Sequence, residues 1–305
     1  MQMGVFFPQL EIGNDPAAIR DFAQAAEDLG YDFIEAMDHV MGVNPASRPG
    51  FSGPYTHRSA FHEAMVLLGF VAGCTRRLGL MTAVLVLSQR QTTLAAKQAA
   101  ELDLLCGGRL RLGIGVGWNR DECESMGMSF HDRGARIEEQ IALMRALWTQ
   151  ELVTLEGRWH SVRDAGINPL PVQRPIPIWI GGMANPVLDR IGRLGDGWLP
   201  KFPGLDPTLQ GRGMKRREED PRDLIARVHA SARAAGRDPA AIGIEGRINL
   251  GGRTPDEWMR ELAAWQALGA THMHVKTMDR GLSPADQIDL LRRFRDCVSP
   301  PDWRA

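Results

Sequence analysis

Residues 78–118 read LGLMTAVLVLSQRQTTLAAKQAAELDLLCGGRLRLGIGVGW, and this stretch decides the predicted fold. Leu78–Leu87 is a short apolar run rich in branched side chains, which is typical of a strand buried on both faces. From Thr92 the apolar residues recur at helical spacing, and Gly107-Gly108 supplies a left-handed cap that ends this helix. Arg109–Val116 then forms a second strand. The order strand, helix, strand predicts a βαβ unit with a parallel sheet.

The same alternation continues through the rest of the chain. Eight strands are expected, each followed by a helix, at residues 5–7, 33–36, 78–87, 109–116, 176–180, 198–199, 242–250 and 271–276. In 305 residues this rhythm predicts a single domain, residues 1–305, with the fold of a (β/α)8 TIM barrel. A doubly wound open sheet is the alternative, but it needs fewer units and a switch point that the sequence does not show.

Three insertions are expected, after strands 2, 4 and 6 of the barrel. They are a long loop over Val40–Ser59, an excursion that ends at Arg174, and a polar stretch over Pro207–Asp223. Helix starts are marked by oxygen-bearing caps followed by proline, at residues 14–16, 254–257 (a capping box) and 283–284.

The composition is that of an ordinary globular protein, with 44% hydrophobic residues, 24% charged residues and a formal net charge of −1. This balance gives no electrostatic footprint for nucleic acid or an acidic membrane surface. Ala64–Thr75 is the longest uncharged apolar stretch and is too short to span a bilayer, and no secretory signal is evident. Four widely separated cysteines lack metal-ligand spacing and favour free thiols in a reducing cytoplasm. We therefore expect a cytoplasmic protein.

In a barrel of this class, function lies at the C-terminal ends of the strands. The residues predicted there are aromatics, methionine, small residues and one histidine, rather than a cluster of carboxylates and histidines. Such a rim favours a flat, largely apolar ligand over a divalent metal ion. The residues are Pro8, Gln9, Asp38, His39, Ala83 to Leu87, Gly117, Trp118, Asn119, Gly181, Gly182, Met183, Trp198, Lys201, Arg247, Asn249 and Lys276.

With these motifs the chain resembles the bacterial luciferase-like family of oxidoreductases, which depend on a flavin or on the deazaflavin F420. The matching stretches are Met3–Val40, the segment quoted above extended to Asn119, the helix start Arg133-Gly134-x-Arg136, and Ile176–Pro200. The last third of the chain fits only by its strand–helix rhythm. The resemblance implies an enzyme that binds F420 or FMN at the barrel mouth and acts on a small organic molecule. We also expect a homo-oligomer, a dimer.

The resemblance places particular weight on His39, at the end of the second strand. It implies that this imidazole contacts cofactor or substrate, whereas a purely structural histidine would only order the loop that follows. Near neutral pH an imidazole can donate to a carbonyl or move a proton, which hydride chemistry requires. Asp38 either orients that ring or bonds backbone amides of the loop. Cofactor contacts are implied for Asp38, His39, Ala83, Val84, Gly117, Trp118, Gly181, Gly182, Met183 and Lys201, and substrate contacts for Gln9, Trp118 and Trp198.

Two backbone features are implied at this site. A bulge with a non-proline cis peptide is expected at Ala83-Val84, although an ordinary buried strand would have the same sequence. Gly181-Gly182, before a helix at about Asn185, is predicted to bind a phosphate, since backbone N–H groups at a helix N-terminus attract anions; Lys201 would be the countercharge.

The aromatic side chains narrow the substrate class. Trp118 and Trp198 are predicted to wall the pocket, and Trp198, between Gly197 and Leu199, has the stronger alternative as a core residue. In sugar-phosphate dehydrogenases of the family, as the resemblance has it, a carboxylate occupies the Trp118 position. Its absence here argues against that substrate class.

Two further patterns are weak signals. His272 and His274 share one face of the last strand, but the partners of an amidohydrolase-type metal pair are missing, so hydrogen-bonded barrel histidines and no metal are predicted. The glycines at positions 113, 115 and 117 lack the spacing of a dinucleotide fingerprint.

The prediction is an F420-dependent oxidoreductase that transfers a hydride between the deazaflavin and a small organic substrate. F420 is preferred because Asp38-His39 resembles its users, whereas many flavin monooxygenases of the family carry Glu-His-His there. An FMNH2-dependent monooxygenase is the first alternative. A barrel that binds a flavin without turnover is the second.

Overall fold

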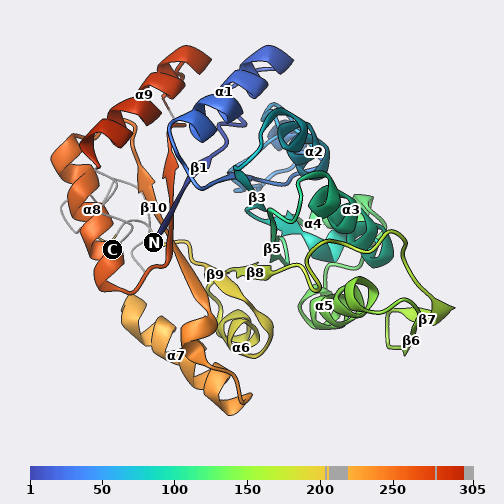
Figure 1. Cartoon of the computed structure of the whole chain (residues 1–305). Helices are drawn as coiled ribbons and strands as arrows, with labels where there is room; N and C mark the ends of the chain where they lie inside the picture. The colour runs from blue at the N-terminus through green and yellow to red at the C-terminus, as the bar shows by residue number, and fades with distance from the viewer. Residues whose placement is uncertain (203–204, 206–218, 279, 299–305) are drawn as a thin grey trace. The chain divides into compact units, whose positions relative to one another are not determined.

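The computed structural model describes residues 1–202, 205, 219–278 and 280–298. Along most of this chain, β-strands alternate with α-helices (Figure 1). The chain divides into two compact units. Unit 1 comprises Met1–Glu35, Arg77–Gly79 and Ile178–Ala305, and unit 2 comprises Ala36–Arg76 and Leu80–Pro177.

The described part of unit 1 contains parallel strands in the order β2-β1-β11-β10-β9-β8. Helices α8 and α9 follow β10 and β11 in the sequence (Figure 1). The strands are β1 (Gln2–Phe6), β2 (Phe33–Ala36, whose last residue belongs to unit 2), β8 (Ile178–Gly181), β9 (Gly197–Leu199), β10 (Gly243–Asn249) and β11 (His272–Lys276). The helices are α1 (Pro16–Asp28), α6 (Asn185–Leu194), α7 (Pro221–Ala234), α8 (Pro255–Ala267) and α9 (Pro284–Cys297), and η4 (Pro239–Ala241) is a 3-10 turn.

One face of this sheet carries side chains in rows. Alternate residues of a strand point to the same face, so Phe33 and Glu35 share a face of β2, and His272 and His274 share a face of β11. The His272 ring lies 4.6 Å from Trp179 and 6.1 Å from Phe33 between ring centroids. Gly4 of β1 leaves room for the Phe33 ring, since a Cβ there would lie 2.3 Å from it. The rings of Phe33, Trp179 and His272 therefore form one row across this face, and Glu35 and His274 lie in the next row along the strands.

Unit 2 contains the segment that decides the predicted fold. In it β3 (Gly79–Thr82, whose first residue belongs to unit 1) and β4 (Leu85–Val86) both pair in parallel with β5 (Leu110–Gly115). A separate antiparallel hairpin joins β6 (Val153–Glu156) to β7 (Ser161–Ala165). The helices are α2 (Ala64–Cys74), α3 (Thr92–Leu105), α4 (Arg120–Ser125) and α5 (Arg133–Thr149), with 3-10 turns η1 (Pro45–Ser47) and η2 (Leu87–Gln89).

Most of the predicted elements are confirmed to within a few residues. The caps also agree: Asp15 and Ser283 accept hydrogen bonds from first-turn amides, and Thr254 forms a capping box with Glu257. Gly107 and Gly108, with φ of 67° and 80°, end α3 in the left-handed region as predicted. If β3 and β4 count as one interrupted strand, the described parallel strands and their helices follow the order of a (β/α)8 barrel.

Some parts of the sequence prediction differ from the structure. The strand predicted over Leu78–Leu87 is interrupted at Ala83-Val84, because a cis peptide bond lies there. The stretch before Arg174 contains the β6–β7 hairpin, and α4 follows β5 directly; neither was predicted. The insertion predicted after the sixth strand lies largely outside the described residues. Within the described ranges, no helix combines the length and the apolar character needed to cross a membrane.

Candidate functional site

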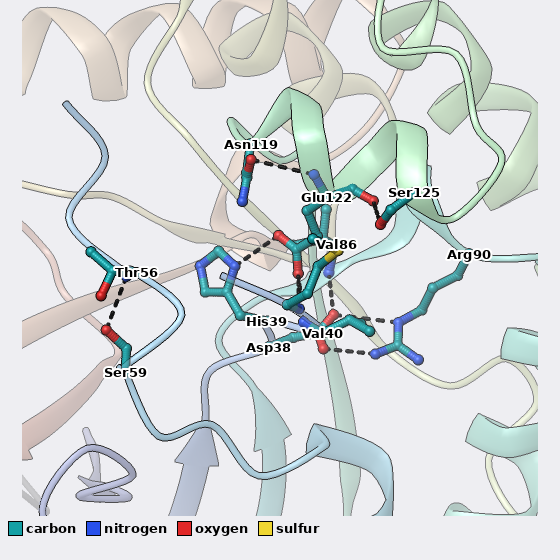
Figure 2. Close-up of polar contacts among 11 residues, drawn as sticks. Asp38, His39, Val40, Thr56, Ser59, Val86, Arg90, Asn119, Glu122 and Ser125 are labelled. Atoms are coloured by element: carbon teal, nitrogen blue, oxygen red, sulfur yellow. Dashed lines mark hydrogen bonds and ion pairs between the residues drawn. The ribbon is translucent and has the colours of Figure 1, made fainter. Parts of the chain in front are cut away.

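The carboxylate of Glu122 holds the imidazole of His39 in unit 2. Glu122 Oε2 lies 2.9 Å from His39 Nδ1, while Glu122 Oε1 accepts a hydrogen bond from the backbone amide of Val40 (Figure 2). The Met41 amide also donates to Oε1, at 3.4 Å. Glu122 is 1% exposed. Because Nδ1 faces the carboxylate, Nε2 lies on the opposite side of the ring (Figure 2).

The environment of Glu122 favours its ionised form. Burial alone would raise the pKa of this carboxyl, but the hydrogen bond from His39 and the amide of Val40 outweigh burial and hold the pKa below its ordinary value. Asn119 caps α4 by accepting a hydrogen bond from the Glu122 amide. The sequence signal was Asn119-x-x-Glu122 shortly after a strand, a helix-start pattern from which no helix was predicted.

Asp38 has partners other than the His39 ring. Its Oδ2 accepts a hydrogen bond from the Val86 amide at 2.9 Å, and its Oδ1 pairs with Arg90 Nη2 at 2.7 Å (Figure 2). Arg90 also pairs with Glu63 at 2.9 Å. Both roles considered for Asp38, orienting the ring and bonding amides of the loop, fall to Glu122. Asp38 instead accepts from the backbone of β4 at Val86.

A cavity of about 310 Å³ opens beside His39. The His39 ring centroid lies 4.9 Å from Phe61, 5.2 Å from Tyr55 and 5.7 Å from Trp118. Trp118 is 40% exposed, so its ring is accessible at the cavity wall. The cavity is lined by His39, Val40, Met41, Gly42, Tyr55, Thr56, His57, Ser59, Phe61, Trp118 and Asn119.

The other predicted residues of unit 2 lie at the ends of its strands. The non-proline cis peptide expected at Ala83-Val84 is present, and it separates β3 from β4. The Ala83 amide donates to the Ala36 carbonyl at 2.7 Å. Gly117 follows β5 with φ of 71°, and a Cβ there would lie 2.5 Å from the Val86 side chain. Close packing thus excludes a larger residue at this position.

A larger cavity of about 580 Å³ in unit 2 contains none of the predicted residues. It lies beside the β6–β7 hairpin. Two of the charged or titratable residues that line this cavity have partners of their own. The buried Arg136 donates to the carbonyls of Ser88 and Ser129, and His160 pairs with Glu139 at 2.7 Å. These contacts join α5 to its neighbours, and we interpret them as structural.

In unit 1, the turn Gly181-Gly182 follows β8 and precedes α6. Gly182 has φ of 130°, which favours glycine, and the cap residue Ala184 has no side-chain oxygen for the first amides of α6. Gly182 is half-buried, whereas Trp198 is fully buried and its indole N–H donates to the Gly182 carbonyl at 2.8 Å. Trp198 therefore has the contacts of a core residue, the stronger of its two interpretations; its substrate contact stays a prediction.

Lys201 and Met183 lie together in unit 1, since the Lys201 amide donates to Met183 Sδ at 3.2 Å. Partial desolvation and the nearby charge of Arg247 hold the pKa of the Lys201 ammonium below its ordinary value. Gln9 is fully buried just after β1. The roles of these three residues in binding stay predictions.

The two histidines of β11 have different partners. His272 bonds the Thr271 hydroxyl at 2.8 Å, whereas His274 Nδ1 lies 2.8 Å from Glu35 and 2.7 Å from Glu245. Burial raises the pKa of Glu35 to about 8, and the charge of Glu245 adds to this rise. Burial opposes protonation of His274, but the two carboxylates raise its pKa to about 9. Neither Glu35 nor Glu245 was predicted from the sequence as a partner of these histidines.

Comparisons with known proteins agree with this architecture. The model of the family described as luciferase-like monooxygenase matches residues 1–293. The F420-dependent glucose-6-phosphate dehydrogenase of Kineococcus radiotolerans is 30% identical, over 84% of this chain and 70% of that protein.

Solved structures share the fold at low identity. One is an F420-dependent secondary alcohol dehydrogenase in complex with an F420–acetone adduct, with a TM-score of 0.75, 16% identity and coverage of 98% and 99% of the two chains. Another is the monooxygenase RslO1 from Streptomyces bottropensis, with a TM-score of 0.74, 19% identity and coverage of 99% of each chain. These likenesses confirm the (β/α)8 barrel. From the family model and the relative at 30% identity, the chain belongs to the luciferase-like family of oxidoreductases.

Proposed function

We propose that this protein is an F420-dependent oxidoreductase in which His39 moves a proton to or from a small organic substrate. The observation that carries the proposal is the His39–Glu122 pair, which fixes the imidazole at the wall of an aromatic cavity. When bound, the deazaflavin would supply a hydride donor or acceptor at its C5.

The pair suits proton transfer in either direction. With Nδ1–H donated to Glu122, a neutral His39 has a lone pair on Nε2. Nε2 can accept the proton of a substrate hydroxyl while the hydrogen on the neighbouring carbon is transferred to the cofactor as a hydride. In the reverse reaction, protonated His39 donates from Nε2 to the oxygen of the carbonyl being reduced. The ionised Glu122 stabilises the imidazolium, because the opposite charge lies within hydrogen-bond distance.

Each unit has residues whose chemistry suits one part of such a cofactor. Tyr55, Phe61 and Trp118 offer ring faces and edges for stacking beside His39. In unit 1, the uncapped start of α6 follows Gly182, and the Lys201 amide contacts Met183 beside this turn; together they have the chemistry of an anion site. Phosphate binding at that turn stays a prediction.

Several considerations favour F420 over FMN. The relative at 30% identity is named for F420, as is another, from Segniliparus rotundus, at 30% identity over 80% of this chain and 67% of that protein. The solved structures do not discriminate, since those named as monooxygenases are 15% to 19% identical and those named for F420 are 16% identical. The sugar-phosphate named for these relatives is not proposed as the substrate here, since this chain has Trp118 where, as the resemblance has it, the sugar-phosphate dehydrogenases of the family carry a carboxylate. A cytoplasmic location and a homodimer stay predictions.

Binding of F420 and FMN, each oxidised and reduced, to the purified apoprotein tests the proposal. We expect F420 to bind at least about tenfold more tightly, followed by anaerobic turnover of a small alcohol or carbonyl compound in a substrate screen. Sub-micromolar FMN binding without F420 binding, and oxygen consumption with reduced FMN, would instead support the monooxygenase. Tight binding with no turnover of any compound would support the non-catalytic alternative.

The phosphate prediction has its own test. Gly182→Asp places a negative charge at the start of α6, and each charge-assisted hydrogen bond lost is worth roughly 1.5–3 kcal/mol, so F420 affinity should fall at least about tenfold. Circular dichroism checks that the variant is folded. Unchanged affinity in a folded variant would remove the phosphate from this turn.

A further inference from the structure

We propose that Glu35, Glu245 and His274, on strands β2, β10 and β11 of unit 1, form a binding site for one first-row divalent metal ion. Each residue offers one ligand atom, and these three atoms all lie within 4.8 Å of one another. Among the described residues, this is the group of histidine, cysteine and carboxylate side chains that meets such a criterion. The site shares no residue with the proposed proton-transfer site and does not depend on the proposed function.

The spacing of the ligand atoms is close to that of a metal site. His274 Nδ1 lies 2.8 Å from Glu35 Oε1 and 2.7 Å from Glu245 Oε1. Ligands held at about 2.1 Å and at right angles around an ion are roughly 3 Å apart. Small rotations of the side chains, without movement of the strands, would bring the atoms to that separation.

The hydrogen bonding of the cluster leaves room for a cation. A single Nδ1–H lies between two carboxylates and can donate a full hydrogen bond to only one of them. Glu35 is fully buried, and its Oε2 receives no hydrogen bond. Buried carboxylates are normally paired, hydrogen-bonded or bound to a metal. A divalent cation matches the two negative charges and needs no further donor.

The surrounding charges define the rival arrangement. Arg247 and Lys276 follow Glu245 and His274 by two residues and so share their face of β10 and β11. Arg247 donates to the Phe202 carbonyl at 3.0 Å through Nε. The rival is a metal-free cluster that shares protons among its own three side chains, with these two cations nearby.

The ligand set indicates which ions would bind. Two carboxylate oxygens and one imidazole nitrogen, without thiolate, suit Mn²⁺, Fe²⁺ or Zn²⁺. Three protein ligands leave at least one position for water or another ligand. The His274 side chain is 13% exposed, which gives an ion a path to the site, whereas Glu35 and Glu245 are almost fully covered.

Metal analysis of tag-free, full-length protein tests the proposal. The protein is stripped with chelator, equilibrated with Mn²⁺ or Zn²⁺, freed of unbound ion and measured by mass spectrometry for metal per chain. We expect about one equivalent of at least one ion, and an absorption spectrum of bound Co²⁺ typical of nitrogen and oxygen ligands. Less than about one tenth of an equivalent of every ion overturns the site, whatever the behaviour of the variants.

Variants assign the bound ion to this cluster. Glu35→Gln and Glu245→Gln keep the shape of each side chain, and each should weaken binding at least tenfold. Glu122→Gln is the matched control, because it alters the other buried glutamate–histidine pair, and it should bind metal as the wild type does. Wild-type binding that persists in the double variant Glu35→Gln/Glu245→Gln, or is lost in Glu122→Gln alone, places the ion elsewhere and contradicts the proposal.

Discussion

Two groups of buried glutamate and histidine, one in each unit, share their side-chain chemistry but differ in how their oxygens are satisfied. In unit 2, Glu122 receives hydrogen bonds from His39 and from the amides of Val40 and Met41. In unit 1, the His274 nitrogen lies between Glu35 and Glu245. The pKa of Glu122 is lowered and that of Glu35 is raised to about 8.

The difference shows what backbone donors contribute to a buried carboxylate. Amides that point at Glu122 stabilise its charge whether or not His39 is protonated, so the ring can exchange its proton while its position stays fixed. Among the described residues, no backbone amide is seen to donate to the Glu35 carboxylate, so its ionised form depends on a neighbouring cation. The first arrangement suits proton transfer, and the second suits a bound ion or a retained proton.

The largest expected effect is on catalysis. His39→Ala should retain F420 binding and lower turnover of the substrate found in the screen by roughly 10²–10⁴-fold, the usual contribution of a general acid or base. His57→Ala is the control, because it removes another imidazole from the wall of the same cavity. Equal losses in both variants, or wild-type turnover in His39→Ala, would make His39 structural.

The second effect is on stability and concerns the unit 1 cluster. In chelator, His274→Ala leaves two buried carboxylates without the charge between them, and removing one partner of a buried pair costs about 3–5 kcal/mol. His272→Ala on the same face should cost less, since it loses mainly ring contacts with Trp179 and Phe33. The free energy of unfolding in urea measures both. A smaller cost for His274→Ala than for His272→Ala would show that its position is not electrostatically critical.

Much of the fold was predictable, because local signals and the tertiary structure agree. The cap at Thr254–Glu257, the glycines after α3 and the apolar run before Thr82 each determine backbone conformation within a few residues. The hairpin β6–β7 was missed because its strands are short and largely exposed, which leaves little hydrophobic alternation to detect.

The candidate site was only partly predictable. His39 was found because it lies shortly after the second strand, a position that can be read from the sequence, and because its Asp-His pair resembles the family pattern. Glu122 and Glu245 were missed because their partners lie 83 and 29 residues away. One sequence without its fold does not specify which carboxylate meets which imidazole. Asp38, adjacent to His39, was the obvious candidate to hold the ring, and it bonds Val86 and Arg90 instead.

The third effect is a pH dependence of stability that comes from Glu122 of unit 2. The pKa of Glu122 is lowered on folding, so its contribution to stability is present above its unfolded value of about 4.3 and is lost as the pH falls through the lower folded value. Glu122→Gln should cost about 1.5–3 kcal/mol at neutral pH, because bonds to a charged acceptor are replaced by weaker ones. The difference in the free energy of unfolding between wild type and Glu122→Gln, measured in urea, should narrow towards pH 3. A constant gap at all pH values would mean that charge plays no part.

The smallest expected effect contrasts an exposed indole with a buried one. Trp118 is 40% exposed beside His39, whereas Trp198 of unit 1 is fully buried and bonds Gly182. Trp118→Leu should weaken F420 binding by about 2- to 12-fold, since an aromatic contact is worth roughly 0.5–1.5 kcal/mol, and should leave stability within about 0.5 kcal/mol. Trp198→Leu should mainly lower stability, because it opens a cavity and leaves the Gly182 carbonyl without its donor. Titration of F420 and urea unfolding of both variants separate the two effects. If Trp118→Leu instead destabilised the protein as much as Trp198→Leu and bound F420 normally, Trp118 would be a packing residue, and the cavity beside His39 would lose its proposed stacking wall.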